Sequence, residues 1–196
     1  MTLTAVLTVG STRFDPLVGA ALSPSALAAL SSLGVTRLLA QVGNSALPRD
    51  WAEGASTVPG GLVVEVVRFL GDLEAKVGEA DLVVSHAGAG SILSFVRPLT
   101  PSPSSSSPSA PSTPSQSHRR LVLVPNSTLM DSHQSDLAGE MEQKGWAVVC
   151  REPSDLAETL RALASEVRRG GTPQHSFPAL DTGKVQRILD EALGFV

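Results

Sequence analysis

A chain of 196 residues, 42% hydrophobic and only 17% charged, has the composition of a globular protein with room for one substantial core. The net charge of −4 argues against a nucleic-acid-binding protein with a basic face, and five Phe, two Trp and no Tyr leave little for base stacking. The single cysteine excludes an intrachain disulfide and a zinc ribbon, and no stretch approaches the roughly 18 consecutive apolar residues of a membrane span. We therefore expect a soluble, cytosolic protein whose membrane contact, if any, comes through a partner.

The first half of the chain alternates short apolar strands with helices. Strands are predicted at 3–9, 37–42, 62–69 and 82–85, helices at 16–33 and 71–79, and a loop at 48–61. Pro24 is expected to begin a second helical piece with Ser23 as its N-cap, and Gly34 to end it.

The second half continues the alternation. Strands are predicted at 121–124 and 146–150. Residues 91–95 are expected to open a helix, and further helices are predicted at 135–144, 154–169 with Ser154 as cap, and 182–195. The whole chain, 1–196, is thus expected to form one α/β domain: a Rossmann-like parallel sheet with helices on both faces. Ligands on such sheets lie beyond the carboxyl ends of the strands, where both Gly10 and Gly88 should be found.

Two segments leave alternatives open. Residues 98–117 are almost wholly Pro, Ser, Thr and Ala, without charge or aromatic side chains, and are predicted to be a disordered insertion. This insertion is either a tolerated surface loop or a phosphorylated regulatory one. The amphipathic helix expected at 182–195 either packs on the sheet of its own domain or helps to dock a partner.

A glycine-rich turn follows the strand predicted at 82–85. The residues Ser85-His86-Ala87-Gly88-Ala89-Gly90-Ser91 let the backbone approach a ligand closely, and the N–H groups of the following helix form an anion site. The alternatives are a tight turn without a ligand and a buried, structural His86. His86 is not a zinc ligand, because no second ligand lies at helical spacing, and the absence of GxGxxG counts against a dinucleotide cofactor.

A second polar cluster, 124–134, follows the next predicted strand and leads into a helix. His133 and Gln134 are expected at the start of that helix, where they can hydrogen-bond the hydroxyls of a sugar. The alternative is that Asp131 or Ser132 caps the helix and that His133 is merely solvated. Since the two strands are neighbours in chain order, both clusters can face one crevice.

Together these motifs resemble a known family. The matching stretches are the segment around Gly10-Ser11-Thr12 (8–18), RLLAQVG (37–43), DLVVSHAGAGSIL (81–93) and VPNSTLMDSHQSDLAGEMEQKGW (124–146). The chain resembles the small, donor-binding subunit of the two-chain UDP-N-acetylglucosamine transferase of asparagine-linked glycosylation. That subunit is of the glycosyltransferase family 28 C-terminal-domain type and is similar to the donor half of GT-B enzymes.

The resemblance implies a UDP-GlcNAc site with a role for each matching position. The diphosphate would be held by the glycine turn, with the loop after the first strand closing the floor of the site. The sugar or ribose would meet the start of the later helix, and the uracil would meet backbone groups after the third strand. The implied diphosphate residues are His86, which is also the candidate catalytic residue, Gly88, Gly90 and Ser91, with Gly10, Ser11 and Thr12 at the floor of the site. The residues implied for the sugar or ribose are His133 and Gln134, and those for the uracil are Phe69 and Leu70.

Ser94 departs from the family pattern. Many relatives carry a carboxylate eight residues after the histidine of the turn, where it grips the ribose hydroxyls. A serine can still hydrogen-bond but lacks charge-assisted acceptors. The general base is expected from the acceptor-binding half, which this chain lacks.

The implied function is transfer of GlcNAc to GlcNAc-diphosphodolichol, in complex with a membrane-anchored, acceptor-binding subunit. The heterodimer would work at the cytosolic face of the endoplasmic reticulum, and this chain would reach that membrane from the cytoplasm through its partner. No cofactor or metal is implied, because the helix dipole can stabilise the diphosphate. The alternatives are a non-catalytic nucleotide-sugar-binding or scaffold subunit, and a polysaccharide glycosyltransferase subunit that uses another UDP-sugar.

Overall fold

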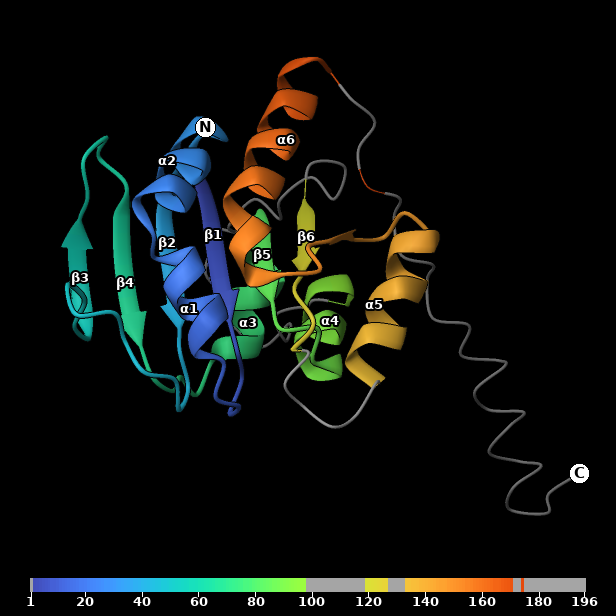
Figure 1. Cartoon of the computed structure of the whole chain (residues 1–196), viewed down its shortest axis with the longest axis horizontal. Helices are drawn as coiled ribbons and strands as arrows, with labels where there is room; N and C mark the ends of the chain where they lie inside the picture. The colour runs from blue at the N-terminus through green and yellow to red at the C-terminus, as the bar shows by residue number, and fades with distance from the viewer. Residues whose placement is uncertain (1, 98–118, 127–132, 171–173, 175–196) are drawn as a thin grey trace, which may run out of the picture.

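A computed structural model of the chain describes residues 2–97, 119–126, 133–170 and 174 (Figure 1). Seven strands form a single sheet in the order β3-β4-β2-β1-β5-β6-β7. The strands are β1 (Leu3–Thr8), β2 (Val35–Gln41), β3 (Gly54–Thr57), β4 (Val63–Val67), β5 (Leu82–Ser85), β6 (Arg120–Leu123) and β7 (Val148–Val149). The helices are α1 (Asp15–Ala21), α2 (Pro24–Ser32), α3 (Leu73–Glu79), α4 (Ala89–Val96), α5 (His133–Gln143) and α6 (Leu156–Arg168).

The expected parallel sheet is confirmed for six strands, whereas β3 runs antiparallel to β4 at the edge. The prediction of a loop throughout 48–61 was therefore wrong at 54–57. All four residues of β3 are exposed, so the strand has no buried face and no apolar alternation to reveal it. It forms because β4 offers a free edge and because Gly60 and Gly61, both at positive φ, turn the chain back.

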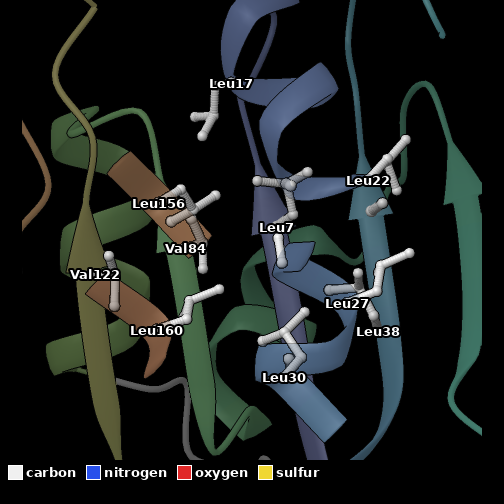
Figure 2. Packing of buried hydrophobic residues seen from close by; sticks show 14 of the residues in the cluster. Leu7, Leu17, Leu22, Leu27, Leu30, Leu38, Val84, Val122, Leu156 and Leu160 are labelled. Carbon is white, nitrogen blue, oxygen red and sulfur yellow. The ribbon is translucent and has the colours of Figure 1, made fainter. Parts of the chain in front are cut away.

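Alternating side chains divide the core into two layers, one on each face of the sheet. On one face, Leu7, Leu38, Val84 and Val122 of the strands pack against α1, α2 and α6, as Figure 2 shows. On this face α2 and α6 lie side by side (Figure 1). The other layer is built from α3, α4 and α5 over strand residues such as Val83 and Leu121. Helices thus cover both faces, as predicted.

Helix ends follow local chemistry in some places and not in others. The predicted N-cap Ser23 is confirmed, because its Oγ accepts the Ala26 N–H at 3.2 Å. The predicted cap Ser154 is wrong. A 3₁₀ turn at Pro153–Asp155 leads directly into α6, so Ser154 is already within turned backbone and its hydroxyl faces Asp155 Oδ1 at 3.3 Å.

Several predictions fall on residues outside the described ranges. The insertion at 98–117 and the helix at 182–195 are among them. Within the residues that the structure describes, no helix has the length and apolar character needed to cross a bilayer.

Candidate functional site at the carboxyl ends of the strands

His86 is the first residue after β5 and is only 8% exposed. Its backbone N–H donates to the carbonyl oxygen of Thr8 at 3.2 Å, and its ring Nδ1 lies 3.3 Å from the same oxygen. Because a carbonyl oxygen only accepts, this contact places the ring proton on Nδ1 and leaves Nε2 as the acceptor of the neutral ring. The imidazole is therefore fixed in one orientation by the end of β1.

Two glycines make room for this ring. A Cβ atom added to Gly88 would lie 2.6 Å from His86 Cε1, and one added to Gly10 would lie 3.2 Å from the same atom. Gly10 also has φ +62°, which L side chains rarely adopt. The turn after β1 and the turn after β5 are thus packed together through the histidine, and neither position accepts a larger residue without moving the ring.

The turn after His86 leads directly into a helix N-terminus. Ala87 is buried at φ +64°, Gly88 is the N-cap, and α4 begins at Ala89, two residues earlier than predicted. No side chain within the described residues caps this end, so the first-turn N–H groups near Gly90 and Ser91 keep their positive partial charge. A Cβ on Gly90 would meet no atom within 4 Å, so open space adjoins that residue.

Ser94 lies one turn further along α4. Its hydroxyl donates to the carbonyl oxygen of Gly90 at 2.9 Å, so its hydrogen is engaged within the helix. The oxygen keeps lone pairs for a ligand hydroxyl, which is an acceptor role only. The ribose contact of Ser94 stays a prediction.

The loop Gly10-Ser11-Thr12 is ordered by short hydrogen bonds. Thr12 Oγ1 donates to Val9 O at 2.6 Å, and Asn44 Nδ2 donates to Ser11 O at 2.9 Å. Ser11 itself is exposed at the edge of the sheet. The loop after β1 is therefore held by the loop after β2, and it borders the His86 turn as the sequence predicts.

Gln41, the last residue of β2, was missed by the sequence reasoning. It is 1% exposed, and its amide makes four hydrogen bonds to the turns around it. The signal was present: a polar residue within the apolar strand 37–42. Such a residue is buried at a cost unless every polar atom finds a partner.

Phe69 and Leu70 follow β4, two strands away from β1. The Arg68 side chain anchors this segment by donating to Gly43 O at 3.2 Å and by pairing with Glu53 at 2.7 Å. Phe69 is 58% exposed, so its side chain is accessible from solvent. Their role in uracil binding stays a prediction.

Leu70 also lines a hollow of about 470 Å³ beside α3. The hollow extends over β1, β2 and β4 to Glu79 and Ala80 at the far end of α3, and charges of both signs surround it, including Arg37, Lys76 and Glu65. Of the candidate site residues only Leu70 lines it. Because acidic side chains share its wall, it suits a diphosphate less well than the start of α4 does.

Gln134 and His133 open α5, and Gln134 is tied to the end of β6. Its Oε1 accepts the N–H of Asn126 at 3.2 Å, and the Asn126 side chain in turn donates to Arg13 O at 3.5 Å. The end of β6 and the start of α5 thus lie against the loop after β1. His133 is exposed. The predicted capping residues Asp131 and Ser132 lie outside the described residues.

The sheet register explains why these segments meet. Thr8, Ser85 and Leu123 are in register across three parallel neighbours, so the turns that follow them lie side by side at one edge, the lower edge in Figure 1. The structure therefore brings together the glycine turn, the loop after β1 and the start of α5. Across the described ranges, no three His, Cys, Asp or Glu side chains cluster as a metal site would require.

Burial lowers the pKa of His86 below its ordinary value of 6.5, and the hydrogen bond to Thr8 opposes this only in part. The unfolded chain then binds more protons than the folded one in the window below pH 6.5, so stability falls as the pH drops through it. We expect urea unfolding to show a larger loss of stability on acidification for the wild type than for His86→Gln. The other histidines are common to both proteins, and equal losses would contradict the expectation.

Comparison with known proteins finds sequence relatives along nearly the whole chain. Residues 4–102 match the family model described as glycosyltransferase family 28 C-terminal domain. A UDP-N-acetylglucosamine transferase subunit ALG13 from Cryptococcus neoformans is 31% identical, with 98% of this chain and 97% of that protein covered. The human protein of the same name is 32% identical over 74% of this chain and 11% of its own length.

Solved structures agree on the fold. An NMR structure of ALG13 matches 96% of this chain and 94% of its own, with a TM-score of 0.57 at 21% identity. The crystal structure of Acinetobacter baumannii MurG matches 88% of this chain but 47% of its own, with a TM-score of 0.50 at 20% identity. The sheet and helices described above therefore correspond to about half of a longer MurG chain.

Proposed function

The chain belongs to the glycosyltransferase family 28 C-terminal-domain family, and we propose that it is the UDP-GlcNAc-binding subunit of a two-chain N-acetylglucosaminyltransferase. The observation that carries the proposal is the His86 turn. Its ring is fixed by Thr8 and enclosed by Gly10 and Gly88, directly before the uncapped N-terminus of α4. Such a helix start attracts the diphosphate of a nucleotide sugar.

In this proposal the chain acts on the leaving group of the reaction. When the sugar is transferred, negative charge develops on the UDP, and the N–H groups at the start of α4 stabilise it without having to reorganise. His86 holds the turn in the shape that aims these groups at the diphosphate. Gly10, Ser11 and Thr12 close the floor of the site near the diphosphate.

The remaining contacts with UDP-GlcNAc are assigned to residues that lie at the same carboxyl edge of the sheet. The Oε1 atom of Gln134 accepts the backbone N–H of Asn126. The NH₂ group of Gln134 is therefore left to donate hydrogen bonds to the sugar or ribose. His133 lies beside it on the first turn of α5. Phe69 and Leu70 receive the uracil, and Ser94 accepts a hydrogen bond from the ribose.

The acceptor side belongs to a second chain. We propose that this partner is membrane-anchored, binds dolichol-linked diphosphate-GlcNAc and supplies the general base, at the cytosolic face of the endoplasmic reticulum. The relatives support a partner, because they are named subunits of a transferase. The fold supports it too, since this chain matches about half of MurG.

The experiment is a transfer assay with the chain alone and with the membrane partner co-expressed. We expect activity only in the complex. His86→Ala should lower the rate by about 10²-fold, the scale of losing one preorganised stabilising element, and Gln134→Ala by about tenfold, the scale of one or two neutral hydrogen bonds. Ser165→Ala, on the exposed side of α6, is the control and should keep the wild-type rate.

Two results would contradict the proposal. Wild-type rates in both His86→Ala and Gln134→Ala would show that the site is wrongly assigned. Full activity of the isolated chain would show that transfer does not need a second subunit.

A further inference from the structure

The last layer of side chains at the carboxyl edge contains a buried polar pair. Thr8 of β1 and Gln41 of β2 are in register, and they are 0% and 1% exposed. Thr8 Oγ1 donates to Gln41 Oε1 at 2.7 Å. An isolated amide at such a place would destabilise the fold, so the partners of Gln41 explain how it can be there.

All polar atoms of the Gln41 amide point at turns of the candidate site. Oε1 also accepts the Gly10 N–H at 3.0 Å. Nε2 donates to two carbonyl oxygens, those of Gly10 and of Arg68, each at 2.7 Å. The NH₂ group faces two carbonyl oxygens, and Oε1 faces an N–H and a hydroxyl donor, so the amide has only one satisfactory orientation.

These bonds join segments that are far apart in sequence. Gly10 begins the loop on the diphosphate side and lies beside the His86 ring, whereas Arg68 precedes Phe69 and Leu70 on the nucleobase side. Gln41 is bonded to the backbone of both. The backbone bond from Gly43 N to Arg68 O at 3.0 Å closes the same junction.

We propose that Gln41 is a positioning residue of the donor site, which holds the loop 10–12 and the segment 68–70 at a fixed separation. The inference rests on the proposed function, because it assigns those two segments to the two ends of UDP. A ligand that spans both ends benefits from their fixed separation, since no binding energy is spent on ordering them. A ligand that reaches only one end benefits less.

The test is calorimetric titration of the full chain with UDP and, separately, with uridine. Gln41→Met nearly keeps the side-chain volume but removes the bonds to both segments. We expect the Kd for UDP to rise about tenfold, the scale of one to two lost hydrogen bonds, and that for uridine to rise about twofold. In the complex with the partner, the KM for the donor should rise by more than kcat falls.

Gln174→Met is the matched control. The Gln174 amide likewise makes two backbone bonds, from Leu121 N at 2.8 Å and to Leu121 O at 3.0 Å, but at the start of β6 and away from the site. It should lower Tm and leave both Kd values within about twofold of the wild type. An effect of general destabilisation would appear in both variants, whereas a positioning effect appears only at Gln41.

A milder variant covers the case in which Gln41→Met does not fold. Thr8→Val removes the hydroxyl that donates to Gln41 Oε1 at 2.7 Å and accepts the Gly10 N–H at 3.2 Å, while the Gln41 bonds to Gly10 O and Arg68 O remain. It should raise the Kd for UDP about threefold. An unchanged UDP affinity in a folded Gln41→Met, or in Thr8→Val should the first not fold, overturns the inference, as does an equal loss for UDP and uridine. Failure of the wild type to bind UDP is a different outcome, because it contradicts the proposed function and not only the role given to Gln41.

Discussion

Gly88→Ala is expected to abolish most donor binding, with a loss of about ten- to a hundredfold in UDP affinity. The new Cβ would overlap the His86 ring, and overpacking of this kind costs about 1–3 kcal/mol. The ring cannot yield freely, because Gly10 also lies close to its Cε1 atom and the Thr8 carbonyl oxygen holds Nδ1. Calorimetry with UDP measures the affinity, and urea unfolding measures the accompanying loss of stability.

Gly139→Ala is the control for this substitution. Gly139 lies within α5, and a Cβ there would meet nothing within 4 Å, so the change should stabilise the helix by up to about 1 kcal/mol. The cause can be isolated with a double variant: in a His86→Ala background, Gly88→Ala should lose most of its cost to stability. An undiminished cost in that background would show that the ring is not what excludes the alanine.

Arg119→Met is expected to give the largest loss of stability, about 2–4 kcal/mol, because three bonds from a charged donor are lost and buried carbonyls are left unpaired. Arg119 is 8% exposed and donates to Ala80 O at 2.9 Å, Phe95 O at 2.9 Å and Val77 O at 3.0 Å. Its guanidinium also lies 4.1 Å from the centre of the Phe95 ring. It thereby joins the ends of α3 and α4.

Thermal unfolding would show this loss as a fall in Tm of roughly 4–16 °C for a domain of this size. Arg37→Met is the control, because the Arg37 side chain is 68% exposed and its ion pair with Glu65 is 4.0 Å long. Such a pair contributes at most about 1 kcal/mol. Equal shifts in the two variants would contradict the role given to Arg119.

The sequence predicted the fold well where strands are buried and poorly where they are not. Runs such as 82–85 have apolar side chains on both faces, which marks a central parallel strand. β3 has no buried face, and it forms only by pairing with β4. No local sequence pattern indicates such a pairing. Ser154 illustrates the same limit, since a suitable capping residue was overridden by the turn that Pro153 begins.

The candidate site shows a similar division. The glycines at 10 and 88 were predicted to admit a ligand, and the structure shows that their first neighbour is the His86 ring. Gln41 lies 45 residues before His86 in sequence, and its partners come from the ends of β1 and β4. Tertiary packing decides which backbone atoms a buried amide contacts. The sequence alone therefore shows only that Gln41 is a polar residue within an apolar strand.

The bond between Arg119 and Phe95 has a consequence for how such a chain can change over time. It ties the last turn of α4 to the residue that leads into β6, so the described end of α4 and the described start of β6 are held together. Doubling the length of a flexible loop costs only about 0.6 kcal/mol once its ends are fixed. This junction lies at the amino end of β6, whereas the turns of the candidate site lie at the carboxyl ends of the strands, on the opposite edge of the sheet. A change in the length of the connection between α4 and β6 is therefore expected to leave the turns of the candidate site in place.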